Sequence, residues 1–232
     1  MGPIFSQAAK ILQNLISTFV SNEMKKASCE KQEGKTVNCK NRYMWIIDHG
    51  HGESTPGKRS PLFEDGTQLR EYIFNRKVSS HLMRMLDENE VCYHNLVPET
   101  ENDVKLSERV SRANALKSDN PSILISVHGN AFGSDWTNPS GIETYYCKGS
   151  TKGETIAQIF QDSLALQTGW KDRGIKTAGF YILKHTSMPA ILTENGFFSN
   201  KSECKKMMTD EWCEKIAAAH FDAIMLIEIE GL

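Results

Sequence analysis

The sequence lacks several features that would place it in a specialised class of protein. Its charges nearly balance, with 27 Lys and Arg against 29 Asp and Glu and a net charge of -2. It therefore has no broad electrostatic attraction for nucleic acid. No apolar run approaches the roughly 18 residues that a transmembrane helix requires. The 6 cysteines are scattered without a CxxC pair, so we expect free thiols, with a Cys29 to Cys39 bridge as the alternative.

Two common catalytic signatures are also missing. The chain has neither a GxSxG nucleophile elbow nor a glycine-rich phosphate loop, which argues against a serine hydrolase and a nucleotide-dependent enzyme. What remains is an ordinary globular composition, with 39% hydrophobic and 24% charged residues among 232. This is enough for one domain and an extension.

The extension comprises residues 1–40. Apolar residues at steps of three and four over 3–24 predict an amphipathic helix, and the polar stretch 25–40 predicts a linker to a single domain over 41–232. Gln13 and Asn14 interrupt the apolar stretch and no basic region precedes it, so we expect no signal peptide and synthesis in the cytoplasm. The helix is expected to pack on the domain, with self-association, a partner, a membrane surface or an autoinhibitory position as alternatives.

Residues 41–232 alternate short apolar runs with helical periodicity, which predicts an α/β domain with a mostly parallel twisted sheet flanked by helices. Strands are expected at 44–47, 92–97, 123–127, 142–146 and 190–193, and helices at 69–87, 105–117, 154–167 and 211–227. The expected inner faces of the first two helices are Ile73, Val78, Leu82 and Met85 or Leu86, and Leu106, Val110, Ala113 and Leu116.

Three of these strands end in ionisable side chains. His51, His128 and Glu194 each follow a buried apolar run and lie beside a glycine. Open α/β sheets place their sites outside the carboxyl ends of the strands, so we expect these side chains to converge. One such residue alone is usually a surface group, whereas three at equivalent strand ends favour a site.

A catalytic zinc ion needs three protein ligands, and two histidines with one carboxylate are a common set. Glu71 opens the helix that follows the first strand, at the same edge of the sheet as His51. It is therefore a candidate third ligand. A solvated carboxylate that complements the helix dipole explains it equally well.

Together these residues resemble the zinc-dependent N-acetylmuramoyl-L-alanine amidases, which cut bacterial peptidoglycan. The similar segments are DHGHG at 48–52, LRE at 69–71, SVHGNA at 126–131, DRGIK at 172–176 and MPAILTENGF at 188–197. The resemblance implies zinc ligands His51, Glu71 and His128, and Glu194 as the catalytic residue. Segment 53–68 is longer than the family pattern, and the chain looks most like the phage or prophage lysin branch.

The remaining histidines are expected to be structural. His49 stands where the family usually has proline. Alternate side chains of a strand point to the same face, so the side-chain direction of His49 does not exclude it as a ligand. The motif favours His51. The others are expected in helices (His81 and His220), in a strand (His94) and in a loop (His185).

By this resemblance the protein hydrolyses the amide between N-acetylmuramic acid and L-alanine, with Glu194 moving the proton. The expected substrate is peptidoglycan, and the place of action is the bacterial cell wall or periplasm. Two alternatives stay open: a zinc peptidase that cuts within the stem peptide, and a catalytically silent wall-binding protein.

Overall fold

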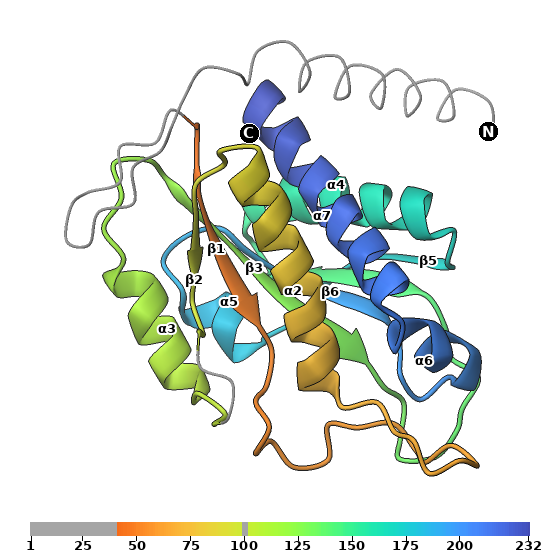
Figure 1. Cartoon of the computed structure of the whole chain (residues 1–232). Coiled ribbons are helices and arrows are strands. Elements are labelled where there is room, and N and C mark those ends of the chain that lie inside the picture. Colours follow the sequence, from red (N-terminus) through yellow and green to blue (C-terminus); the bar gives the residue numbers. More distant parts are fainter. Residues whose placement is uncertain (1–40, 99–101) are drawn as a thin grey trace.

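The computed structural model describes residues 41–98 and 102–232 (Figure 1). Its strands are β1 (Met44–His49), β2 (Tyr93–Asn95), β3 (Ser122–Asn130), β4 (Ile142–Tyr146), β5 (Asp172–Thr177) and β6 (Ala190–Phe197). Its helices are α2 (Glu71–Glu88), α3 (Leu106–Ala115), α4 (Thr151–Thr168), α5 (Tyr181–His185), α6 (Lys201–Met207) and α7 (Asp210–Glu230). This confirms the predicted α/β class. The predicted helix and linker over 1–40 lie outside the described residues, and the boundary at residue 41 stays a prediction.

The strands form one sheet in the order β2-β1-β3-β6-β4-β5. All neighbouring strands run parallel except β4 and β6, which are antiparallel. The carboxyl ends of β1, β3 and β6 therefore meet at one edge of the sheet. Within that edge His128 on β3 is the Cα partner of Glu194 on β6.

Helices cover both faces of the sheet. The core on one face contains residues from α2, α4 and α7, and the core on the other contains residues from α3 and α5 (Figure 1). All six residues of β1 are buried, as expected for a strand between two helical layers.

Some details of the helices differ from the prediction. Ile73 and Leu106 were expected on inner faces, but their exposed fractions are 42% and 52%. Phe74 is buried in place of Ile73, and Leu86 is buried while Met85 is only partly so. Each helix is therefore rotated slightly from the simplest apolar stripe. Leu106 is the first residue of α3 and lines a cavity, so it is not part of the core that Val110 and Ala113 join.

Three short elements were not predicted. β5 contains a glycine and has no fully buried residue, and α5 and α6 are too short to show a clear period. His185 ends α5 and does not lie in a loop, so that expectation is wrong. His81 and His220 lie in helices and His94 lies in a strand, as predicted.

The cysteines only partly follow the prediction. Cys147, Cys204 and Cys213 are free thiols. Cys92 is disulfide-bonded, so the expectation of a free thiol is wrong there. Cys29 and Cys39 lie outside the described residues.

Along the described segments, no helix is both long enough and apolar enough to cross a bilayer.

His220 fixes α7 against the sheet through two buried hydrogen bonds. Its Nδ1 lies 2.8 Å from the Ile216 carbonyl, which can only accept, so Nε2 must accept from the Thr193 hydroxyl at 2.9 Å. Burial lowers the pKa of His220 to about 4. The ring therefore stays neutral in the fold at pH values where an unfolded chain would bind a proton.

We expect His220 to make the fold less stable in mild acid. Between about pH 6.5 and 4 the unfolded chain binds the extra proton, so the free energy of unfolding falls as the pH falls, by about 3 kcal/mol for this residue. In the His220→Gln variant this pH slope should be smaller. Urea unfolding at several pH values measures it, and an unchanged slope would contradict the assignment.

Candidate metal centre and active site

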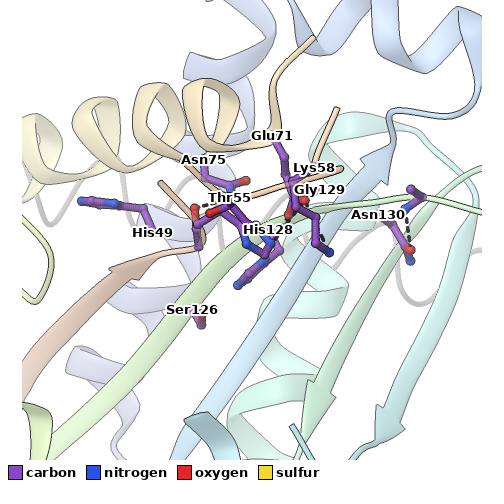
Figure 2. Close-up of polar contacts among 12 residues, drawn as sticks. His49, Thr55, Lys58, Glu71, Asn75, Ser126, His128, Gly129 and Asn130 are labelled. Atoms are coloured by element: carbon purple, nitrogen blue, oxygen red, sulfur yellow. Dashed lines mark hydrogen bonds and ion pairs between the residues drawn. The ribbon is translucent and has the colours of Figure 1, made fainter. Parts of the chain in front are cut away.

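Three predicted ligands meet at the carboxyl edge of the sheet. His51 follows β1, Glu71 opens α2, and His128 lies near the end of β3. Glu71 Oε2 lies 3.3 Å from His51 Nε2, and Glu71 Oε1 lies 3.0 Å from His128 Nδ1. Each residue offers one ligand atom, and the three atoms lie within 4.8 Å of one another. The structure thus brings together residues that lie far apart in the sequence (Figure 2).

Glu71 is the acidic centre of this group. Burial alone would raise its pKa, but contacts with His128 and His51 lower it below its ordinary value. For His128 the directions are reversed. Burial alone would lower its pKa, but the hydrogen bond to Glu71 raises the pKa above its ordinary value. A buried carboxylate that stays ionised between two imidazoles is a suitable ligand set for a divalent cation.

The chain around His51 adopts an unusual backbone shape. His51 has a φ of 65°, in the left-handed region that favours glycine. Its carbonyl accepts hydrogen bonds from Arg76 and Arg109, each at 3.2 Å, which hold this conformation. Asn75 donates to the Gly50 carbonyl at 3.0 Å and so fixes the preceding residue. The loop is therefore held in place before any ligand binds.

Gly50 leaves room for the second histidine. A Cβ atom at Gly50 would lie 2.0 Å from His128 Cε1 and 2.4 Å from His128 Nε2. Atoms cannot approach so closely, so any larger residue would displace the His128 ring. On its other side Asn195 donates to the His128 carbonyl at 2.9 Å.

Glu194 is the fourth predicted residue, and it points to the same site. It lies beside His128 in the sheet, and its Oε2 is buried without a hydrogen-bond partner in the described part of the chain. Burial raises the pKa of Glu194 to about 8, the charge on His128 opposes this and the Glu71 carboxylate adds to it. Carboxyl groups with such pKa values are typical of proton transfer at neutral pH.

A buried ion pair lies behind the site. Arg109 Nη1 lies 2.6 Å from Asp48 Oδ1, and both side chains are about 2% exposed. Ser126 donates to the other oxygen of Asp48 at 2.6 Å. Arg109 also donates to the His49 carbonyl at 2.8 Å. These contacts tie α3 to the end of β1, just before His51.

The site opens into a cavity of about 370 Å³. His51, His128 and Glu194 line it together with Leu106 and Phe180, which come from the starts of α3 and α5. The cavity therefore combines ionisable groups with an apolar wall, as substrate sites of enzymes commonly do.

His49 does not join the ligand group. Figure 2 shows its side chain pointing away from His128 and Glu71. Burial lowers its pKa to about 4, so it is neutral at ordinary pH. The choice of His51 over His49, made from the motif, agrees with this placement.

Sequence reasoning missed the supporting residues. Arg109 resembles the solvent-facing cations of any amphipathic helix, so no pattern indicated its burial. Asn195 lies within the segment 188–197 and Asn75 lies four residues after Glu71, but their hydrogen bonds to backbone carbonyls depend on the fold. Asp48 adjoins the first motif histidine and was the one available signal.

The group fits a zinc ion on the chemistry of its donor atoms. His51 Nε2 and Glu71 Oε2 are buried, yet neither makes a hydrogen bond in the described part of the chain. Buried polar atoms without partners are costly, and a shared cation would satisfy both. Two imidazoles, one carboxylate and an adjoining cavity match an open catalytic zinc site.

Comparisons with known proteins agree with this geometry. The sequence matches the family described as N-acetylmuramoyl-L-alanine amidase over residues 46–225, which include all four site residues. The chain belongs to this amidase family. It is similar to the N-acetylmuramoyl-L-alanine amidase LytC of Bacillus subtilis, with 30% identity over 89% of this chain and 37% of LytC. The chain thus spans little more than a third of that relative's length.

The chain is also similar to a phage protein and to a protein of known structure. The endolysin of Bacillus phage SPP1 is 31% identical over 79% of this chain and 65% of the endolysin. An N-acetylmuramoyl-L-alanine amidase from Clostridium difficile 630 superimposes with a TM-score of 0.73 and 27% identity, covering 83% of this chain and 100% of that one. The relatives therefore include both bacterial and phage enzymes.

The clash at Gly50 gives a test of the candidate metal centre. Gly50→Ala should displace the His128 ring and lower zinc affinity at least about tenfold, because shifted ligands bind metal poorly. Competitive titration with a chelating dye measures it. Gly179→Ala is the matched control, since no atom lies within 4 Å of the Cβ it would add. Equal zinc affinities in the two variants would contradict the role of Gly50.

Proposed function

We propose that this protein is a zinc-dependent N-acetylmuramoyl-L-alanine amidase, which hydrolyses the amide between N-acetylmuramic acid and L-alanine of peptidoglycan. The observation that carries the proposal is the meeting of His51, Glu71 and His128 within 4.8 Å, beside Glu194, whose Oε2 atom is buried. The family and its named relatives support the choice of bond.

The proposed zinc ligands are His51, Glu71 and His128. A zinc ion in such a site supplies Lewis-acid chemistry, polarising a carbonyl and making water more acidic. The residues of the chain then position the reactants. Asn75 and Arg109 hold the backbone that carries His51, and Asn195 holds the backbone of His128.

Glu194 is the proposed proton carrier. It accepts a proton from the water that attacks the scissile carbonyl carbon, and it returns that proton to the alanine nitrogen when the C–N bond breaks. The products are a free lactyl carboxylate and a peptide with a free amino terminus. A pKa near neutrality lets one group both accept and donate within a cycle.

Glu194→Gln should lower kcat by about 10² to 10⁴-fold, because an amide of the same shape cannot accept the proton. Zinc content should stay at the wild-type level, since Glu194 is not a proposed ligand. Turbidity loss of purified cell walls measures activity, and elemental analysis measures zinc. Glu211→Gln, on the exposed start of α7, is the control. Wall hydrolysis at the wild-type rate by Glu194→Gln would rule out this role.

The bond cut can be read from the products. Purified peptidoglycan should release peptides that begin with a free alanine amino group, together with glycan whose muramic acid carries no peptide. Removing zinc with a chelator should stop the release, and added zinc should restore it. Mass spectrometry of the released fragments measures both.

The same experiment separates the alternatives. Fragments cut between two amino acids would indicate a zinc peptidase, and no fragments from zinc-loaded protein would indicate a silent wall-binding protein. We infer action at the bacterial cell wall or periplasm, as the presence of an endolysin among the relatives supports. The division into an extension over 1–40 and a catalytic domain over 41–232 belongs to the same proposal.

A further inference from the structure

The charged side chains that line the cavity differ in whether they have a close partner of opposite charge. Asp48 and Asp103 both pair with Arg109, at 2.6 Å and 3.1 Å. The Thr55 hydroxyl also donates to Asp103 at 2.6 Å. These two carboxylates and one guanidinium therefore form a closed cluster that has no need of a further charged partner.

Lys58 and Lys105, which also line the cavity, make no such close ion pairs with the described residues. Lys58 Nζ lies 3.9 Å from Glu71 Oε2, beyond hydrogen-bond distance, and its side chain is 47% exposed. In the described part of the chain no other carboxylate lies within 4.0 Å of it, and none lies that close to Lys105. If Glu71 binds zinc, it leaves Lys58 without an anion. Lys58 and Lys105 are thus the two lysines of the cavity lining, and Lys58 has no close anion but Glu71 among the described residues.

The backbone of Lys58 is held by the backbone of Glu71, one of the proposed zinc ligands. Its carbonyl accepts a hydrogen bond from the Glu71 backbone N–H at 2.9 Å, and the adjoining Arg59 and Arg70 form an antiparallel bridge. Figure 2 shows Lys58 beside Glu71. Lys58 belongs to segment 53–68, which is longer than the family pattern. The segment therefore does more than connect two elements, because it carries a cation to the edge of the site.

We propose that Lys58 and Lys105 form a subsite that binds a carboxylate of the stem peptide, a role that rests on the proposed amidase function. In such a peptide the first free carboxylate lies about two residues from the scissile bond. This separation is about 7 Å in an extended chain. Lys58 lies within that reach of the ligand group. Ammonium groups in a partly desolvated cavity bind carboxylates by charge-assisted hydrogen bonds. The subsite distinguishes stem peptides by their charge.

Two small substrates that differ in one group test this. With the γ-carboxyl of the glutamyl residue blocked as an amide in both, N-acetylmuramoyl-L-alanyl-D-glutamate has one free carboxylate, the α-carboxylate, and the D-isoglutamine form has an uncharged amide there. Lys58→Gln and Lys105→Gln should each raise KM for the acid about tenfold and change KM for the amide less than twofold, with kcat unchanged. Lys148→Gln, an exposed lysine outside the cavity, is the matched control and should change neither.

Binding without turnover separates this inference from the proposed function. In the Glu194→Gln background, calorimetry should show tighter binding of the acid than of the amide, and the lysine substitutions should remove that preference. Equal losses for acid and amide, or no loss for either, would overturn the subsite. Failure of the wild type to release alanine-terminated peptides from walls would instead overturn the proposed function, and acid-over-amide binding would still decide the role of the lysines.

Discussion

The buried ion pair between Arg109 and Asp48 is the contact on which the geometry of the site depends. One guanidinium neutralises Asp48 and also donates to the carbonyls of His49 and His51. A helix on one face of the sheet thus holds the loop that carries the first ligand. Breaking such a pair by removing one partner typically costs about 3 to 5 kcal/mol, because a charge is left buried without compensation. The ligand loop would lose its support at the same time.

The sheet supplies the second constraint. Parallel strands place His51 and His128 at one edge, and β6 brings Glu194 beside His128. His128 and Glu194 therefore lie on neighbouring, hydrogen-bonded strands, while His51 follows the strand on the other side of β3 and Glu71 begins the helix α2. This arrangement separates two duties: the strands fix the reacting groups, while segment 53–68 and the starts of α3 and α5 shape the space that a substrate enters.

The sequence indicates which ionisable side chains meet at the edge of the sheet, but it says little about the residues that support them. Apolar runs that end in His51, His128 and Glu194 are a local signal, and the carboxyl ends of parallel strands share an edge in any such fold. Glu71 follows because helices begin at that edge. Arg109 could not be predicted, since its burial depends on Asp48, a residue 61 positions away.

The left-handed backbone at His51 has a consequence for the evolution of this chain. A residue with a side chain pays about 1 to 2 kcal/mol for that conformation, whereas glycine adopts it freely. Glycine at this position would relieve the strain but would lack the imidazole. The fold and the proposed chemistry thus make opposite demands on one residue, because glycine would favour the backbone conformation at position 51 while removing a proposed zinc ligand.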